Sequence, residues 1–480
     1  MKRFRVIIPT VFLLISLLAT RGLSAATGAG ETVDITGVWQ GALKIQAMEL
    51  RLVVHLSADS TGAWAATMDS PDQGAFGIPI DKVKFNGDSL RFDVAVVRGF
   101  YEGKFVADSL IFNGHWNQGG MSLPLKLTKV DKAPEIKRPQ LPQKPYPYDE
   151  EEVSYRNETA AIQITGTLTS PRGDGPFPAV LLISGSGAQD RDESLFNHKP
   201  FLVLSDYLTR RGIAVLRVDD RGVGGTGGSV NQSTSEDFAS DVLAGVQFLK
   251  NHPRIDKSKI GLIGHSEGGL IAPMAAARSG DVAFIVLMAG PGLTGEEILY
   301  LQAALISRAS GQSEEAIEEN RVQQEQLFTI MKSEPNDSLA TIKIKDIVKK
   351  SFEKMTDEER KQAGDVEEIA RGQAKRILTP WFRYFLTYDP RIVLGQVKCP
   401  VLAINGGKDL QVPPKENLTA IEKALKDAGN NRVTIREIPD LNHLFQTSTS
   451  GAPMDYGKIE ETMAPAAMAI IGDWIVEVCR

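Results

Sequence analysis

The sequence contains few cysteines and, beyond its first residues, no cluster of basic side chains. Cys399 and Cys479 are the only two cysteines in 480 residues, which permits one disulfide without requiring it. No Cys/His spacing is typical of a zinc site, so a structural metal is not expected. The formal net charge of −6 and the lack of a Lys/Arg block disfavour nucleic acid as a partner.

Long apolar runs are also scarce, and the one at the N-terminus is short. Basic side chains precede the apolar run 6–19, and small residues follow at 24–26. A membrane span needs about 20 consecutive apolar residues, whereas this layout is typical of a secretory signal peptide. We therefore predict a signal peptide over residues 1–26, export to the periplasm or the medium, and no permanent membrane span.

The length and composition predict a globular protein of two or three domains. The chain is 42% hydrophobic and 24% charged, as ordinary globular proteins are, and it is too long for one average domain. Residues 33–130 form short apolar or alternating segments separated by Gly, Asp, Asn and Pro. This pattern predicts a small antiparallel β-domain, a sandwich or barrel, with a glycan or envelope partner as a hypothesis. We interpret Trp39, Trp64 and Trp116 as core residues rather than as a ligand face.

A proline-rich segment separates this domain from the rest of the chain. Five prolines lie between Pro134 and Pro147, which predicts an extended linker over residues 131–150. From 151 to 480, apolar strands alternate with helical patterns, as in a mostly parallel α/β sheet with helices on both faces. The stretch at about 293–390 is helical and charge-rich, and it predicts a cap inserted near the ligand-binding edge of the sheet.

The segment GLIGHSEGG, residues 261–269, is the strongest local sign of chemistry. An apolar strand runs into Ser266, which has a glycine two residues to either side, and a helical pattern follows. This is the arrangement of a nucleophile elbow, in which a serine on a tight strand-to-helix turn attacks a carbonyl. At a helix N-terminus, the orphan N–H groups and the helix dipole favour developing negative charge.

A serine hydroxyl needs a base and an acid to act as a nucleophile. Of the six histidines, only His443 lies in a loop directly after a late core strand. His265 is the neighbour of Ser266, where side chains diverge on the turn. Asp409 ends the preceding core strand in a glycine-rich loop at the same sheet edge. We predict Ser266, Asp409 and His443 as a catalytic triad, with Asp440 as a rival acid.

The oxyanion of such a reaction needs two backbone N–H donors. We predict the N–H of Glu267, which follows the nucleophile, and that of Ser186, with Gly187 as an alternative to Ser186. The acidic–basic clusters at 190–192 and 219–221 accompany these loops. They are expected to pair with each other and brace two loops.

Aromatic side chains concentrate at the end of the predicted cap. The segment PWFRYFLTYDP contains Trp381, Phe382 and Tyr384. Lining a substrate pocket and packing the cap onto the core are alternatives for them. We predict these three as substrate-binding residues.

Together these motifs resemble the α/β-hydrolase superfamily. GHSEGG, GGKDLQVPP and LNHLF carry the likeness, and the opening SGSGAQDRD is most similar to bacterial EstD-type carboxylesterases. The likeness covers roughly residues 151–480. It implies an α/β-hydrolase fold, with Ser266, Asp409 and His443 as nucleophile, acid and base, and short acyl esters as substrates.

Three functions follow as hypotheses. The first is an exported serine carboxylesterase that works through an acyl-enzyme and needs neither a metal nor an organic cofactor. The second keeps the triad but cleaves amides, as a serine aminopeptidase or acyl-peptide hydrolase, with Glu267 or the Asp-rich loops holding a free amine. The third is a non-catalytic binding protein of the cell envelope.

Overall fold

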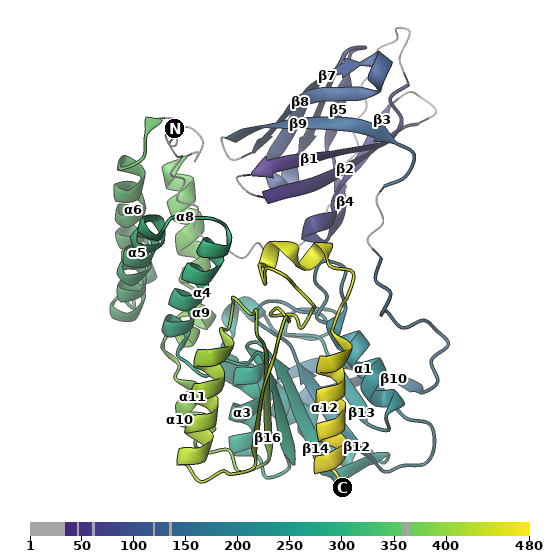
Figure 1. Cartoon of the computed structure of the whole chain (residues 1–480), viewed down its shortest axis with the longest axis vertical. Coiled ribbons are helices and arrows are strands. Elements are labelled where there is room, and N and C mark those ends of the chain that lie inside the picture. Colours follow the sequence, from purple (N-terminus) through teal and green to yellow (C-terminus); the bar gives the residue numbers. More distant parts are fainter. Residues whose placement is uncertain are drawn as a thin grey trace. The chain divides into compact units, whose positions relative to one another are not determined.

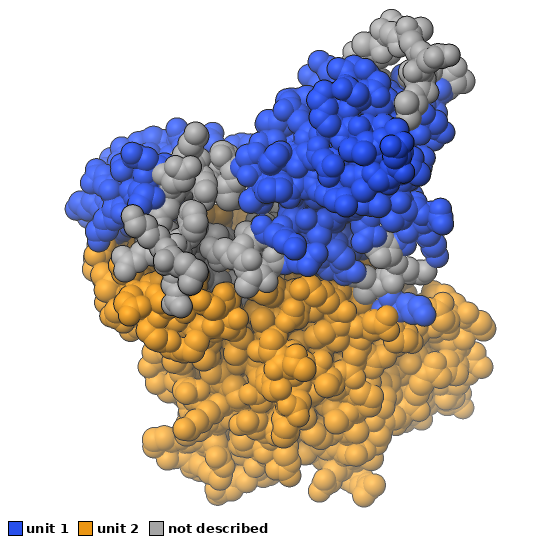
Figure 2. All heavy atoms as spheres, turned by 45° about the horizontal axis from the view of Figure 1, so that its top comes forward, with its two compact units in different colours: residues 1–137, 341–374 blue, residues 138–340, 375–480 orange. Residues whose placement is uncertain are grey.

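The computed structural model describes residues 34–45, 48–59, 63–118, 121–133, 137–357, 360 and 365–480. The predicted signal peptide at 1–26 lies outside the described residues. The chain divides into two compact units, which Figure 2 shows in blue and orange. We call residues 1–137 with 341–374 the β unit, and residues 138–340 with 375–480 the α/β unit. In the described part of the chain, no helix has the length and apolar character that crossing a bilayer requires.

The β unit is built on one antiparallel sheet of nine strands (Figure 1). Its strands are β1 (Gly37–Ile45), β2 (Met48–Ala58), β3 (Trp64–Ser70), β4 (Ala75–Pro79), β5 (Lys82–Phe85), β6 (Ser89–Val94), β7 (Gly99–Val106), β8 (Ile111–Gln118) and β9 (Met121–Val130). Their order is β4-β3-β2-β1-β9-β8-β7-β6-β5, so the first and last long strands pair in the middle. The sheet is a half-barrel, and the predicted all-β domain is confirmed.

The inner face of this sheet holds an aromatic core. Trp39 and Trp116 are almost fully buried, and the ring of Trp39 lies 4.6 Å from that of Phe112. The indole N–H of Trp39 donates to the carbonyl of Ile35, so its polar atom is satisfied. Trp64 is half-buried and packs edge-to-face on Phe85. These tryptophans therefore serve as packing residues of the half-barrel.

The α/β unit contains a mixed sheet of eight strands in the order β10-β11-β13-β12-β14-β15-β16-β17. The strands are β10 (Asp149–Asn157), β11 (Ile162–Ser170), β12 (Phe177–Ile183), β13 (Ala214–Val218), β14 (Ile255–His265), β15 (Phe284–Met288), β16 (Val401–Gly406) and β17 (Val433–Ile438). β11 pairs antiparallel with both β10 and β13. The remaining neighbours pair parallel. The sheet is thus mixed: the opening hairpin contributes two antiparallel pairings, and the other five pairings are parallel.

Helices cover both faces of this sheet (Figure 1). They are α1 (Pro200–Arg210), α2 (Ser235–Asn251), α3 (Gly268–Arg278), α10 (Pro390–Leu394), α11 (Pro414–Asp427) and α12 (Pro465–Val478). Successive side chains of a strand point to opposite faces. Val180 and Leu182 therefore pack with α1 and α12, whereas Leu181 and Ile183 pack with α2, α3 and α11. Coverage on both faces explains why β12 is apolar without alternation.

The segment between β15 and β16 is helical. It contains α4 (Gly295–Ala309), α5 (Glu314–Ser333), α6 (Asp337–Glu353), α8 (Val366–Ile377) and α9 (Pro380–Thr387), followed by α10. Residues 341–374, with most of α6 and α8, group with the β unit, whereas α4, α5 and α9 belong to the α/β unit. Cys399 and Cys479, which lie in the α/β unit, are both free thiols.

The second half of the predicted linker is bound to the α/β unit. The Arg138 guanidinium donates to the carbonyls of Phe196, Gly457 and Ile459 at 2.8–2.9 Å. The Gln140 side chain accepts from the backbone N–H of Met463 at 3.0 Å and donates to its carbonyl at 2.6 Å. Proline alone makes a segment stiff but gives it no partner. From Arg138 onward, hydrogen bonds fix the segment beside the start of α12.

Replacing Arg138 should destabilise the α/β unit. Arg138→Ala leaves three partly buried carbonyls without their charged donor, and hydrogen bonds to charged groups contribute about 1.5–3 kcal/mol each, so a loss of about 2 kcal/mol or more is expected. The measurement is the urea unfolding midpoint of the full chain. Arg156→Ala is the control, because Arg156 is exposed and pairs only with exposed Glu158. Equal midpoints for the two variants would show that the hydrogen bonds of Arg138 do not stabilise the unit.

Candidate active site

Ser266 lies on the turn between β14 and α3, where the sequence predicts it. Its φ is 52°, in the left-handed region that non-glycine residues rarely adopt. Such strain is found mainly where a side chain must be presented for function. The Ser266 side chain is only half-buried between buried neighbours. The backbone thus presents one hydroxyl at the carboxyl end of the strand.

Glycines make this turn sterically feasible. A Cβ at Gly264 would lie 2.0 Å from the carbonyl oxygen of Gly268, and a Cβ at Gly268 would lie 2.1 Å from the carbonyl oxygen of Ile183. A Cβ at Gly269 would lie 2.6 Å from the Cα of Gly290. No side chain fits at such distances, so strand and helix can approach only with glycine at these positions.

His443 and Asp409 form a buried pair at the same edge of the sheet. His443 Nδ1 lies 2.7 Å from Asp409 Oδ2, and both side chains are nearly inaccessible. The other carboxylate oxygen, Oδ1, accepts from the backbone N–H of Gln411 and Val412 at 2.8 and 2.9 Å. A neutral ring that donates through Nδ1 keeps Nε2 as an acceptor, so this pair can act as a base.

The rival acid lies elsewhere. Asp440 is exposed and pairs with Lys408 Nζ at 3.0 Å. The fold therefore brings Asp409, and not Asp440, to His443.

The base loop, which we define as residues 439–446, is joined to the residue before the nucleophile. The carbonyl of His443 lies 3.0 Å from His265 Nε2, and the two imidazole rings are 5.0 Å apart. Among the described residues, the Ser266 hydroxyl makes no hydrogen bond to His443. Catalytic hydrogen bonds are often long before substrate binds and shorten in the complex. The arrangement thus brings the predicted nucleophile and the predicted base to one edge without a preformed bond between them.

The oxyanion loop, defined as residues 184–189, passes directly beside the nucleophile. A Cβ on Gly185 would lie 3.3 Å from the Cβ of Ser266. Within the described chain, the backbone N–H groups of Ser186, Gly187 and Glu267 have no hydrogen-bond acceptor. Both predicted donors, Ser186 and Glu267, and the alternative Gly187 are therefore free to donate to a bound group.

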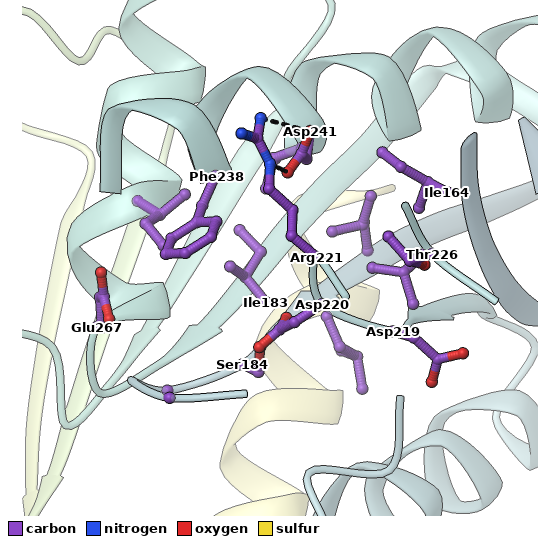
Figure 3. A pocket seen from close by; sticks show the side chains of 17 residues that line it. Ile164, Ile183, Ser184, Asp219, Asp220, Arg221, Thr226, Phe238, Asp241 and Glu267 are labelled. Atoms are coloured by element: carbon purple, nitrogen blue, oxygen red, sulfur yellow. Dashed lines mark hydrogen bonds and ion pairs between the residues drawn. The ribbon is translucent and has the colours of Figure 1, made fainter. Parts of the chain in front are cut away.

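Acidic side chains hold this loop: Asp220, from the cluster expected to brace the loops, and Glu193, which the sequence analysis did not single out. Asp220 accepts from the Ser184 hydroxyl at 2.8 Å and from the Gln189 N–H at 3.0 Å, so it fixes both ends of the loop. Burial raises the pKa of Asp220 to about 8. Glu193 Oε1 accepts from the N–H of Gly185 at 2.6 Å. Figure 3 shows Ser184 and Asp220 side by side.

The acidic–basic clusters pair partly as expected. Arg191 bonds Asp219 through its guanidinium, at 2.7 Å, and through its backbone N–H. Arg221 instead bonds Asp241 of α2, as the dashed lines in Figure 3 show. The pairing of Arg191 with Asp219 joins the two clusters as expected, whereas the partner of Arg221 on α2 was not predicted.

The Glu267 side chain is engaged by neighbouring elements. Its Oε1 accepts from the Ser235 hydroxyl at 2.6 Å and from the Trp381 indole N–H at 2.7 Å. Burial raises the pKa of Glu267. Glu267 and Asp220 line a small, partly open space of about 40 Å³ (Figure 3). That volume has room for only a few waters, so it is not a pocket for an acyl chain.

The three predicted aromatic residues of α9 take different positions. Trp381 reaches the elbow through Glu267 and stacks on Phe385 at 5.1 Å. Phe382 lies 6.4 Å from the ring of Phe328 in α5. The Tyr384 hydroxyl donates to Glu236 at the start of α2. Only Trp381 of the three contacts a residue next to the nucleophile.

The sequence of this chain matches a known protein family and several known esterases. The family described as serine aminopeptidase, S33 (Hydrolase_4), matches residues 200–448, just over half of the chain. Esterase EstD of Thermotoga maritima is 29% identical over 302 residues, which are 62% of this chain and 61% of that protein. Esterase FrsA of Escherichia coli is 30% identical over 128 residues, which are 27% of this chain and 28% of that protein. The chain thus spans about three fifths of EstD and under a third of FrsA.

Solved structures are also similar at low sequence identity. Esterase Pf2001 of Pyrococcus furiosus is 15% identical, with a TM-score of 0.41, over 72% of this chain and 98% of that one. The predicted resemblance to α/β-hydrolases and EstD-type esterases is confirmed by the family match and by EstD. Because the family match covers more than half of its residues, the chain belongs to the serine aminopeptidase, S33, family.

Proposed function

We propose that this chain is a serine carboxylesterase that hydrolyses short-chain acyl esters. The observation that carries the proposal is the buried His443–Asp409 pair, at 2.7 Å, beside a serine held at positive φ. The similarity to the esterase EstD, of which this chain covers three fifths, supports an ester substrate. Export to the periplasm or medium, and a glycan or envelope partner for the β unit, belong to the same proposal. They rest on the N-terminal sequence and on the separate β unit.

The mechanism follows from the roles of three side chains. His443 Nε2 takes the proton from Ser266 Oγ as the oxygen attacks the ester carbonyl carbon. The N–H groups of Glu267 and Ser186 stabilise the negative carbonyl oxygen, and Asp409 stabilises the imidazolium. His443 then gives its proton to the leaving alcohol, and an acyl-enzyme remains. Water, deprotonated by His443, attacks the acyl carbon; the bond to Ser266 Oγ breaks, His443 returns its proton to Oγ, and the acid is released.

Amide cleavage is the second candidate, favoured by the name of the family. A peptidase that holds a free amine needs an ionised carboxylate near the nucleophile. Glu267 is the carboxyl group next to Ser266, but Ser235 and Trp381 already donate to it. Burial also raises its pKa, which favours the neutral acid. A neutral, occupied carboxyl group binds an ammonium poorly, so esters are the better-supported substrates.

The first test is Ser266→Ala in the purified mature chain. We expect the hydrolysis of short p-nitrophenyl esters to fall by about 10³-fold or more, because the nucleophile is lost. The substrates are p-nitrophenyl esters of rising acyl length, compared with aminoacyl and acyl-peptide anilides. Ser279→Ala, at the far end of α3, is the control and should keep full activity.

Two outcomes would change the proposal. Faster cleavage of anilides than of esters would make the enzyme a peptidase. Ester hydrolysis that persists undiminished in Ser266→Ala would remove the mechanism altogether.

The second test separates the two candidate acids. Asp409→Asn keeps the side-chain shape but removes the charge that fixes and stabilises the His443 imidazolium. We expect kcat to fall by about 10⁴-fold, as for the acid of other triads. Asp440→Asn is the matched control, since Asp440 is exposed and bonded to Lys408. The kcat of both variants is measured by steady-state kinetics at pH 8. A larger loss of kcat in Asp440→Asn than in Asp409→Asn would make Asp440 the acid of the triad.

A further inference from the structure

Glu193 and His265 form a second buried carboxylate–imidazole pair, outside the proposed triad. Their side chains are 4% and 7% exposed, and His265 Nδ1 lies 2.9 Å from Glu193 Oε1. The two residues are 72 positions apart in the chain. Neither residue has a role in the mechanism described above.

The hydrogen bonds of His265 define its charge. Nδ1 faces a carboxylate oxygen of Glu193, and Nε2 faces the backbone carbonyl of His443 at 3.0 Å. Both partners are acceptors, and a neutral imidazole has only one N–H to donate. With Glu193 as a carboxylate, both bonds can form together only if the ring is an imidazolium. The geometry therefore makes His265 a cation paired with Glu193.

The surroundings of His265 agree with this charge. Burial disfavours the cation, but the carboxylate of Glu193 outweighs it, so the pKa of His265 is raised. The charge of Asp409 acts in the same direction. The rings of His443 and Phe445 lie 5.0 and 6.4 Å from the ring of His265.

The pair joins two loops that the proposed reaction needs. Glu193 Oε1 accepts from Gly185 N–H of the oxyanion loop as well as from His265. His265 in turn bonds the carbonyl of His443 in the base loop. A continuous path of hydrogen bonds therefore runs from the oxyanion loop to the base loop past Ser266. Glu193 also has a φ of 51°, a strained conformation for glutamate that its contacts must maintain.

We propose that Glu193 and His265 are positioning residues that fix the oxyanion loop relative to the base loop on either side of Ser266. This inference rests on the proposed esterase function. A displacement of about 1 Å between catalytic groups can cost about 10²-fold in rate. Substrate binding in the ground state depends less on the oxyanion donors, because the charge that they stabilise develops only in the transition state.

The kinetic test uses Glu193→Ala, Glu193→Gln and His265→Gln in the full chain. We expect Glu193→Ala to lower kcat by about 10²–10³-fold, as loss of an oxyanion donor does, with KM within about threefold. Glu193→Gln should lose less, because an amide oxygen can still accept from Gly185 N–H. The kcat of the double variant Glu193→Gln/His265→Gln should be close to that of the less active single variant, because the two residues act as one unit.

A stability-matched control separates positioning from folding. Thr169 is buried in β11 and bonded to Ser205 and Thr209, so Thr169→Val also removes buried hydrogen bonds in the α/β unit. Each rate is divided by the fraction of protein molecules in which a phosphonate reacts with Ser266, so that only folded, active protein is counted. If Thr169→Val, at an equal loss of melting temperature, lowers kcat as much as Glu193→Ala does, positioning is overturned. Unchanged kcat in Glu193→Ala has the same consequence.

A spectroscopic test reads the ion pair without using activity. In ¹⁵N-histidine-labelled protein, the ring assigned to His265 by its absence from His265→Gln should carry protons on both nitrogens at pH 7 and 8. A singly protonated ring at both pH values would overturn the ion pair. Ser266→Ala is run in parallel, so a failure of the esterase mechanism is recognised separately from a failure of the positioning role.

Discussion

The close approach of backbones around Ser266 is the constraint on which the site depends. The carbonyls of Gly268 and Ile183 lie where any Cβ at Gly264 and Gly268 would have to sit. β12, β14 and the start of α3 can therefore come nearer to each other than elements with side chains can. That approach carries the loop after β12 against the nucleophile, so that Gly185 lies beside the Ser266 side chain. One steric condition thus provides both the half-buried serine and its adjacent N–H donors.

Loops at the sheet edge have no ladder of hydrogen bonds, and buried backbone N–H groups need acceptors. Acidic side chains fill this role here. Asp220 accepts from Gln189 N–H, Glu193 from Gly185 N–H, and Asp409 from Gln411 N–H. Such bonds satisfy the N–H group and also offset the cost of burying the acid. The same acids leave the N–H of Ser186 unbonded, which explains how a rigid loop can still offer a donor to substrate.

The sequence was sufficient where a feature depends on neighbours in the chain. Ser266 could be placed because its two glycines, the strand and the helix are local. Remote partners are harder to place: the sequence favoured Asp409 from its position after a core strand, with Asp440 as a rival, and the fold brings Asp409 to His443. Glu193 and His265 were missed because no periodicity links residues 72 positions apart. Trp381 likewise could be assigned to the site only as an aromatic residue, since its bond to Glu267 depends on how α9 docks.

The two histidines show why a carboxylate partner alone does not identify a catalytic base. His443 and His265 each bond an acidic side chain through Nδ1, at 2.7 and 2.9 Å. They differ at Nε2. On His265 that nitrogen faces the carbonyl of His443, so it must carry a proton and cannot accept one. On His443, no hydrogen-bond partner for Nε2 occurs among the described residues, so this nitrogen can take the proton of Ser266. The second nitrogen, rather than the acid, therefore distinguishes the base from the residue that positions it.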